Sequence, residues 1–204
     1  FCMGASVGNA VGFSIAQGDN GGPRAVGVIG DGTFLHGGIP GLIDMVYKGS
    51  RSTLVICDNM TTGMTGQQAN PSSGHTIHGE AAPRVDLVKL IESIGVRHVR
   101  VVDPYDLKAL RKTLSEAIRH PGPAVVVARH ACLMIKEERA KIREPIQFEA
   151  EKCNFCKLCH DLGCPAIEWD DETGPIVDEL QCMGCEMCAA LCHPKALYGL
   201  GVPE

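Results

Sequence analysis

The sequence predicts an α/β fold in which helices cover a parallel sheet, followed by a small cysteine-rich unit of the α+β class. Short apolar runs rich in Val and Ile recur through residues 1–130, and helical patterns separate them, as in parallel sheets covered on both faces. Eight of the 11 cysteines fall within the last 52 residues. We therefore expect a first domain at 1–130, a linker at 131–150 and a second domain at 151–204.

The elements of the first domain follow in order from these patterns. A helix of small residues is expected at 4–17, with no strand before it. The expected strands lie at 25–29, 53–57, 97–102 and 124–128, and the expected later helices lie at 39–47, 85–94 and 105–119. Between 131 and 150 the pattern gives way to charged residues, which indicates a linker or a surface helix.

Charge divides the chain into two different parts. Residues 1–150 carry 16 basic and 14 acidic groups, whereas residues 151–204 carry 3 basic and 10 acidic groups, a net charge of −7. An acidic surface suits a basic partner protein, and it equally suits a solvated face that keeps a small domain soluble. No apolar run is long enough to span a bilayer, and we expect neither a membrane nor a nucleic-acid partner.

The beginning of the chain is unusual for a complete α/β domain. Phe1 is not an initiator methionine, and the first helical pattern has no strand before it. We therefore expect a further N-terminal part, either in the same polypeptide or as a separate chain. The sequence shows no secretory signal, which favours a cytoplasmic location and reduced cysteines.

Two cysteine runs near the end of the chain are near-copies of one pattern. They comprise Cys153, Cys156, Cys159 and Cys164, and Cys182, Cys185, Cys188 and Cys192. Three cysteines at intervals of three, with a fourth near a proline, suit the thiolate ligation of a cuboidal iron–sulfur cluster. Structural zinc, which uses separated ligand pairs, and disulfides, which need an oxidising compartment, fit this spacing less well. The sequence therefore predicts two [4Fe-4S] clusters in a bacterial-type ferredoxin domain.

The fourth cysteine of each run is expected to ligate the cluster of the other run, as in two-cluster ferredoxins. The first predicted ligand set is Cys153, Cys156, Cys159 and Cys192, and the second is Cys182, Cys185, Cys188 and Cys164. The first run has one residue more than the second before its fourth cysteine. A slightly different loop is expected there.

Polar residues end two of the expected strands of the first domain. Strand 25–29 runs into Gly30-Asp31-Gly32, and strand 53–57 runs into Asp58-Asn59. Ligands bind at the carboxyl ends of parallel strands, and carboxylate and amide oxygens suit Mg²⁺ and the phosphates it bridges. The Gly37-Gly38 step is expected to precede a helix and to offer free backbone amides to the same anion.

These residues resemble the diphosphate-binding domain of thiamine diphosphate enzymes, whose signature is GDG followed by Asn after roughly 25 to 30 residues. The resemblance implies that Asp31 and Asn59 ligate Mg²⁺ through their side chains and Thr61 through its carbonyl oxygen. The residues expected to bind the cofactor are Gly30, Asp31, Gly32, Thr33, Asn59, Thr61, Gly63 and Met64.

The wider stretches 30–41 and 58–67 look like one family in particular, the indolepyruvate:ferredoxin oxidoreductases, and specifically the C-terminal half of their alpha subunit. The resemblance covers essentially the whole chain. It implies oxidative decarboxylation of a 2-oxo acid to an acyl-CoA, with electrons passed singly through the clusters to an external ferredoxin. It also implies a pyrimidine-binding domain and a small beta subunit as partners. An aliphatic or branched-chain substrate range, and a non-catalytic electron-transfer module, are the alternatives.

Several residues are candidates for contact with the reacting atoms. Met3 lies 28 residues before Asp31, where the resemblance implies an apolar side chain beneath the bent cofactor; a core methionine is the alternative. His36, Met64, Thr65 and Gln67 are placed by loop position to face the substrate. His36 could orient the substrate or move a proton, or it could be structural.

Other residues are expected to have no part in the chemistry. Cys2, Cys57 and Cys132 lack ligand spacing and are expected to be small buried hydrophobes. The resemblance implies that a glutamate of the pyrimidine-binding domain activates the cofactor, and neither Glu80, in a polar loop, nor Glu92, in a helix, fits that role. We therefore expect residues 1–204 alone to be catalytically incomplete.

Overall fold

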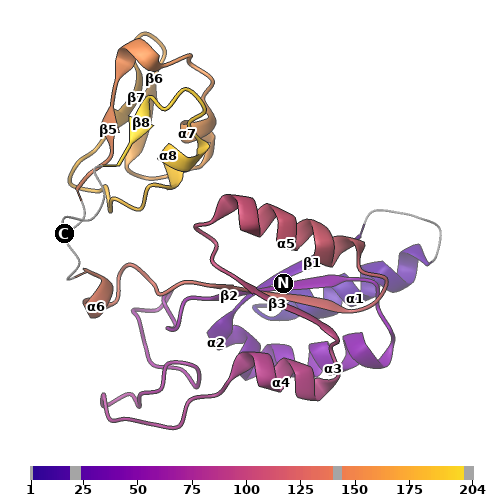
Figure 1. The fold of residues 1–204 in the computed structure, drawn as a ribbon. Coiled ribbons are helices and arrows are strands. Elements are labelled where there is room, and N and C mark those ends of the chain that lie inside the picture. The colour runs from indigo at the N-terminus through magenta and orange to yellow at the C-terminus, as the bar shows by residue number, and fades with distance from the viewer. Residues whose placement is uncertain (1, 19–23, 140–143, 200–204) are drawn as a thin grey trace. The chain divides into compact units, whose positions relative to one another are not determined.

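The computed structural model describes residues 2–18, 24–139 and 144–199. The chain divides between Ile135 and Lys136 into two compact units. Each unit has its own sheets and its own apolar core. Figure 1 shows the elements of both units, and each unit is described by itself below.

The first unit is built on a four-stranded sheet of order β1-β2-β4-β3. All three pairs of neighbouring strands are parallel. The strands are β1 (Val26–Gly30), β2 (Thr53–Asp58), β3 (His98–Val102) and β4 (Ala124–Arg129). Each lies within one residue of its expected range, and the predicted parallel α/β fold is confirmed for this unit.

Helices cover both faces of this sheet (Figure 1). One face carries α1 (Ala5–Gln17), α3 (Ile39–Tyr47) and α4 (Leu87–Ile94). Their apolar side chains pack on the inward residues of the strands, for example Leu42 and Ile91 against Ile56. The other face carries α5 (Leu107–Arg119), whose Ala117 packs in a smaller cluster with Val126. None of the described helices is long and apolar enough to cross a membrane.

Two helices begin two residues later than the sequence pattern predicts. The side chain of Asp86 accepts hydrogen bonds from the backbone amides of Val88 and Lys89 before α4. Asp106 accepts one from the amide of Ala109 before α5. An aspartate that satisfies the free amides of the first turn fixes where a helix starts. The predicted helix starts at 85 and 105 are therefore too early, because Asp86 and Asp106 are caps that precede the first helical residues.

The strand β1 passes directly into a helical run without a connecting loop. The run comprises α2 (Asp31–Thr33), the π-helical segment η1 (Phe34–Gly38) and α3. A Cβ on Gly38 would lie 2.9 Å from Ile29 Cδ1 and from Phe34 Cδ2, so glycine is needed for the segment to pack on β1. The expectation that Gly37-Gly38 precedes a helix is wrong, because both residues lie inside the run and its amino end is at Asp31.

The second unit consists of short elements. Its helical segments are α6 (Lys136–Arg139), η2 (Ala150–Lys152), α7 (Leu158–Asp161) and α8 (Met187–Leu191). Two antiparallel pairs join β5 (Gln147–Phe148) to β8 (Leu197–Tyr198), and β6 (Ile167–Asp170) to β7 (Gly174–Val177). The strand β5 falls within the stretch expected to be a linker, so the folded part of this unit begins before residue 151.

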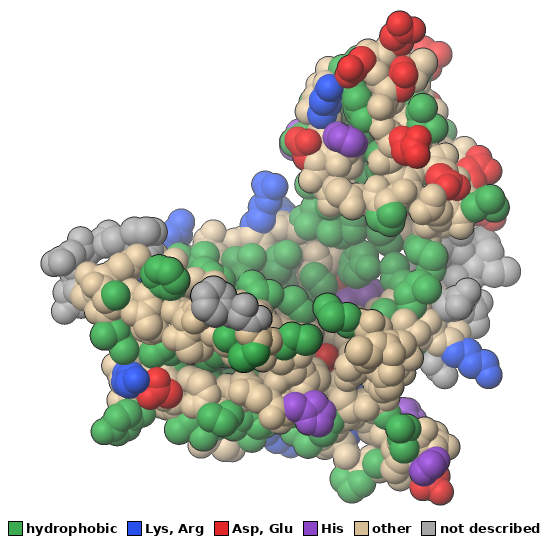
Figure 2. All heavy atoms as spheres, turned by 180° about the vertical axis from the view of Figure 1, so that it is seen from behind, with side chains coloured by type: hydrophobic (Ala, Val, Ile, Leu, Met, Phe, Trp, Pro, Cys, Tyr) green, Lys and Arg blue, Asp and Glu red, His purple; other side chains and the backbone are tan. Residues whose placement is uncertain are grey.

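The core of the second unit is small and contains cysteines. Five buried residues form it: Ile146, Cys159, Ile167, Cys188 and Leu197. Figure 2 shows Asp and Glu side chains spread over the surface of this unit on the face in view. The unit therefore combines a core rich in thiols with an acidic exterior.

Candidate functional site

The carboxyl ends of β1 and β2 bring the predicted polar residues to one edge of the sheet. Gly30 lies opposite Cys57 in the parallel register of these strands. Asp31 follows Gly30 and Asn59 follows Asp58, so both predicted ligands leave neighbouring strand ends. Asp58 has a different partner, because its Oδ2 accepts a hydrogen bond of 2.6 Å from Arg129 Nε on β4.

Asp31 is a buried carboxylate, with only 3% of its surface exposed. The backbone amide of Gly32 donates to its Oδ1 at 2.7 Å, and Asn70 Nδ2 and Ser72 Oγ lie 3.2 Å from its Oδ2. Burial raises the pKa of the carboxyl group despite these neutral donors. A carboxylate in this setting gains stability from a bound cation, which fits the predicted Mg²⁺.

The loop after β2 packs closely on the start of the helical run. A Cβ on Gly32 would lie 2.7 Å from Thr62 Oγ1, so the last residue of the GDG motif must be glycine for Thr62 to approach. Thr61 is buried. Its amide donates to Asn59 Oδ1 at 3.3 Å, and its hydroxyl donates to the carbonyl oxygen of Gln68 at 3.2 Å. The predicted ligands Asn59 and Thr61 are thereby held in one short turn.

Four predicted residues, Gly32 among them, meet around one hollow beside this site. Met3, Thr33 and His36 line it, and its volume is about 510 Å³. The other lining residues are Gly32, Gly37, Thr62, Gln68 and Ala69. Met3 is 68% exposed, so its alternative assignment as a core methionine is wrong. An apolar side chain and an imidazole therefore face the same space near the buried carboxylate.

Three other predicted residues do not line this hollow. Met64, Thr65 and Gln67 are exposed at the tip of a loop closed by a bridge between Thr62 and Gln68. Within the tip, Thr65 Oγ1 donates to Gln68 Oε1 at 2.5 Å. The residues at the base of the loop therefore reach the hollow in place of those at its tip.

Sequence reasoning missed several residues of the site. They are Thr62, Gln68, Ala69, Asn70 and Ser72. All five lie in a polar loop without periodicity or motif spacing, and which of its residues turn toward Asp31 depends on how the loop folds back. The sequence offers no signal that separates them from their neighbours.

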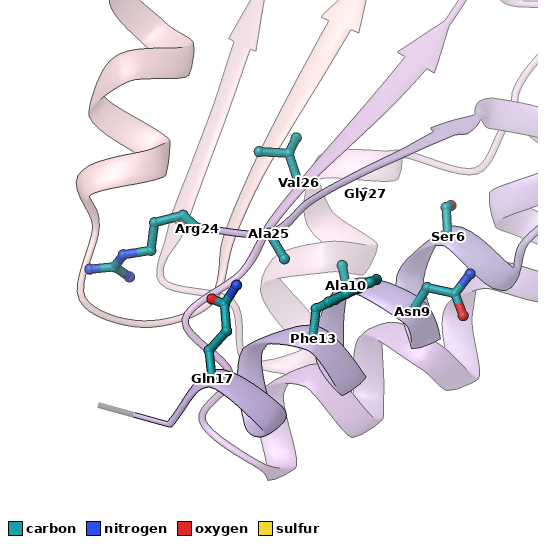
Figure 3. Close-up of a pocket in the computed structure, with 9 residues that line it drawn as sticks. All are labelled: Ser6, Asn9, Ala10, Phe13, Gln17, Arg24, Ala25, Val26 and Gly27. Atoms are coloured by element: carbon teal, nitrogen blue, oxygen red, sulfur yellow. The ribbon is translucent and has the colours of Figure 1, made fainter. Parts of the chain in front are cut away.

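A second hollow lies at the other end of β1, where the strand begins (Figure 3). Its volume is about 310 Å³, and it is lined by Ser6, Asn9, Ala10, Phe13, Gln17, Arg24, Ala25, Val26 and Gly27. Arg24 is engaged elsewhere, because its Nη1 donates to the carbonyl oxygens of Arg51 and His120. Among these lining residues there is no carboxylate, thiol or imidazole, so this hollow offers less chemistry than the one beside Asp31.

The second unit brings together four of the predicted cluster ligands. Cys153, Cys156, Cys159 and Cys192 line one apolar hollow. Phe148 and Trp169 also line it. Cys192 belongs to the second run, so the chain fold joins it to the first three cysteines of the other run. Within the described residues, no three His, Cys, Asp or Glu side chains converge on a point that could hold a single metal ion.

The two cysteine runs have matching backbones. Phe155 and Lys157 in the first run have φ values of 57° and 60°, and Gly184 and Glu186 at the equivalent positions have φ values of 61° and 61°. In each run the second of these residues precedes a short helix, α7 or α8. The left-handed residues turn the chain so that successive cysteines can face one centre.

Backbone amides and burial act on the cysteine sulfurs. Sulfur atoms accept N–H hydrogen bonds at Cys153, at Cys182 and at Cys192, over 3.4 to 3.5 Å. Burial raises the pKa of the Cys188 thiol to about 11 and also raises that of Cys159. These buried thiols are neutral at pH 7 unless a bound cation stabilises the thiolate. Cys164 packs beside the core of the unit.

The three cysteines outside the runs differ from expectation. Cys2 and Cys57 are exposed and Cys132 is partly exposed, so their predicted assignment as buried hydrophobes is wrong. Cys57 is the one exposed residue of β2, although Val55 on the same face of the sheet is buried.

Comparison with known proteins identifies the family. The sequence model of a family described as "Thiamine pyrophosphate enzyme, C-terminal TPP binding domain" matches residues 1–128. The chain belongs to the thiamine pyrophosphate enzymes. The predicted resemblance to this class is thereby confirmed, and the GDG motif with Asp31 lies inside the matched range.

Named relatives show which thiamine pyrophosphate enzymes this chain resembles. The chain is 39% identical over 96% of its length to the indolepyruvate oxidoreductase subunit IorA of Methanothermobacter marburgensis, and 41% identical over 93% of its length to that of Pyrococcus horikoshii. It spans about a third of the length of these relatives, 31% and 32%. These similarities confirm the resemblance to the indolepyruvate oxidoreductase alpha subunits.

One solved structure supports the fold. The 2-oxoglutarate:ferredoxin oxidoreductase from Magnetococcus marinus superposes with a TM-score of 0.57 at 23% identity, over 65% of this chain and 47% of that chain. At this identity the likeness concerns the fold alone. It agrees with a thiamine pyrophosphate enzyme fold built on a parallel sheet.

Proposed function

We propose that this chain forms the cofactor-binding and electron-transfer part of a thiamine diphosphate-dependent 2-oxo acid:ferredoxin oxidoreductase. The substrate we propose is indolepyruvate or another arylpyruvate, and the product is the acyl-CoA. The observation that carries the proposal is the buried carboxylate of Asp31 at the end of β1, within a chain whose other unit gathers four cysteines around one hollow. The names of the relatives support the substrate class.

The first unit would hold Mg²⁺ and the diphosphate. Asp31 and Asn59 would ligate the cation through side-chain oxygens and Thr61 through its carbonyl oxygen. The backbone near Gly30, Gly32, Thr33, Gly63 and Met64 would contact the cofactor. When bound, thiamine diphosphate supplies the carbon nucleophile that makes the loss of CO2 from a 2-oxo acid possible. The burial of Asp31 and its three neutral donors support this assignment.

The residues around the hollow would contact the bound cofactor and the substrate. Met3 would press its apolar side chain against the bound cofactor and keep it bent. His36 would orient the substrate or carry a proton, which an imidazole can do near neutral pH. Met64 and Thr65, at the loop tip, would close over the substrate. The shared lining of Met3 and His36 supports the first two roles.

The second unit would carry electrons away from the cofactor one at a time. One [4Fe-4S] cluster would be held by Cys153, Cys156, Cys159 and Cys192, and the other by Cys182, Cys185, Cys188 and Cys164. The hollow lined by the first set and the N–H groups that point at sulfur atoms support the assignment. Hydrogen bonds to sulfur tune the potential of such clusters. In this proposal the first domain covers 1–130, and the ferredoxin-like domain covers 151–204 together with β5, which pairs with β8.

The proposed reaction needs partners. A pyrimidine-binding domain, in the same polypeptide or in a separate chain, would supply the carboxylate that activates the cofactor. A small beta subunit, an external ferredoxin and coenzyme A complete the set. The reduced thiols that the clusters need suit a cytoplasmic location.

The proposal is tested on the full-length subunit assembled with its beta subunit under anaerobic conditions. We expect Mg²⁺-dependent binding of thiamine diphosphate by calorimetry, about eight iron atoms per chain by iron assay, and reduction of a viologen by indolepyruvate with coenzyme A. If aliphatic 2-oxo acids turn over faster than aryl ones, the substrate is an aliphatic 2-oxo acid and the proposed substrate class is wrong. Iron without cofactor binding would favour the second candidate, a non-catalytic electron-transfer module, which the cysteine hollow supports by itself.

A further inference from the structure

Two loop residues that no motif marks form hydrogen bonds with the predicted metal ligand. Asn70 Nδ2 and Ser72 Oγ each lie 3.2 Å from Asp31 Oδ2. Asn70 is 6% exposed and Ser72 is 1% exposed. They lie 39 and 41 residues beyond Asp31, so their contact with it is made only when the long loop folds back on the end of β1.

The orientation of the Asn70 amide is fixed by its own contacts. Its Oδ1 accepts from the amide of Ser72 at 2.8 Å and lies 2.7 Å from Ser72 Oγ. A backbone N–H can only donate, so the oxygen of the amide must face Ser72 and the NH₂ group must face Asp31. The NH₂ group has a second proton to donate, and Thr62 Oγ1 lies 3.5 Å from Asn70 Nδ2.

This arrangement treats the two oxygens of Asp31 differently. Oδ2 faces both Asn70 and Ser72, whereas the amide of Gly32 is the one donor to Oδ1 among the residues that the structure describes. A carboxylate oxygen has two lone-pair directions. Asn70 donates to Oδ2, and Ser72 Oγ lies beside the same oxygen, with its one proton shared between Oδ2 and Asn70 Oδ1. One direction of Oδ1 stays open for a cation.

We propose that Asn70 and Ser72 are positioning residues that turn Oδ1 of Asp31 toward Mg²⁺ and couple cation binding to the order of the loop. The inference rests on the proposed function, since it concerns the same metal. Asn70 joins Asp31 to Thr62, and Thr62 forms the bridge with Gln68 that closes the base of the loop. Thr62 and Gln68 both line the hollow, so a bound cation and the substrate-side loop share one hydrogen-bonded network.

The coupling has a definite direction. A cation on Oδ1 would hold the carboxylate of Asp31 in one orientation, with Oδ2 facing Asn70 and Ser72. Binding of Mg²⁺ with thiamine diphosphate therefore orders these two residues and the loop that carries them, and it protects the loop amides from exchange.

The experiment uses the full-length protein and the variants Asn70→Ala and Ser72→Ala. Calorimetry measures the affinity for Mg²⁺ and thiamine diphosphate, and hydrogen exchange follows the amides of 60–78 with and without them. We expect each variant to bind Mg²⁺ about 10- to 100-fold more weakly, as for other residues that orient metal ligands. We also expect the protection gained on binding to be lost. Ser72→Thr keeps the hydroxyl and is expected to retain most of the affinity.

Thr76→Ala is the matched control. Its hydroxyl accepts from the amides of His78 and Glu80 within the same loop and has no contact with Asp31. We expect it to alter exchange locally and to leave the affinity unchanged. Equal affinity in Asn70→Ala and the unaltered protein, or equal weakening by Thr76→Ala, would overturn the inference and leave the proposed function standing. No binding to the unaltered protein would overturn both.

Discussion

The two units of this chain support their candidate sites in opposite ways. In the first, 13 buried apolar residues form the main core, and the polar site lies at the edge of the sheet above them. In the second, two of the five core residues are cysteines, and Cys164, Cys182 and Cys192 pack around them. The first unit can therefore fold before its ligand binds, whereas proposed ligands make up two of the five core residues of the second and pack around the rest.

Removal of iron is the strongest way to separate the two units. A domain this small rarely folds on its apolar core alone, and metal binding then supplies its folding free energy. We expect iron-free protein to lose amide protection throughout 144–199 while the sheet of the first unit keeps it. Hydrogen exchange with mass spectrometry measures both in one sample.

The control for iron removal is Cys132→Ser, which changes a thiol outside both runs. This variant is expected to keep its iron and its protection. Full protection of 144–199 after iron removal would show that the second unit does not depend on its ligands.

A cavity in the apolar core should have the reverse effect. Ile56 is fully buried in the centre of β2, and Ile56→Ala is expected to lower the free energy of unfolding of the first unit by about 3 kcal/mol. Urea denaturation, followed by hydrogen exchange of the amides in the first unit, measures this free energy of unfolding. Val28→Ala, at an exposed position on the neighbouring strand, should cost less than about 0.5 kcal/mol. A cluster spectrum that changed with Ile56→Ala would contradict independent units.

A charged pair also stabilises the edge of the sheet where the site lies. Arg129 Nε donates to Oδ2 of Asp58, whose side chain is fully buried. Arg129→Met leaves that carboxylate without its partner and is expected to cost about 2 kcal/mol. Lys48→Met removes the exposed pair with Asp44 and should cost less than about 0.5 kcal/mol. Thermal denaturation measures the stability of both variants. An equal loss of stability in the two would show that burial of Asp58 does not make its ion pair more important than the exposed one.

The smallest expected effect is a pH dependence from Asp31. Burial raises the pKa of this carboxyl group in the folded protein above the ordinary value of 3.8, so the folded state binds a proton more tightly than the unfolded state. Without cations, the free energy of unfolding should fall as the pH rises from 3.8 to the raised pKa. Asp31→Asn should flatten this dependence.

Mg²⁺ provides the check on that prediction. A bound cation favours the carboxylate and lowers its pKa in the folded protein, so with Mg²⁺ and thiamine diphosphate the fall in stability above pH 3.8 should disappear, and stability should instead rise with pH below 3.8. Denaturation curves at several pH values, with and without both ligands, measure the sign. The same slope in Asp31→Asn and the unaltered protein would assign the dependence to another group.

The sequence alone determined the features that local patterns encode. Alternating apolar and helical segments predicted each strand of the first unit within one residue, and the GDG motif placed Asp31 at the end of β1. The likeness of the cysteine runs to those of two-cluster ferredoxins predicted that Cys192 joins the first run, and the four residues line one hollow. Such features depend on residues close together in the chain or on a fixed spacing.

Which loop residues complete the site depends on how the chain folds back on itself. Asn70 and Ser72, rather than the residues at the loop tip, reach Asp31, because the loop after β2 folds back and is closed by the bridge between Thr62 and Gln68. These outcomes depend on contacts between distant segments, for which an irregular polar loop has no periodicity to record.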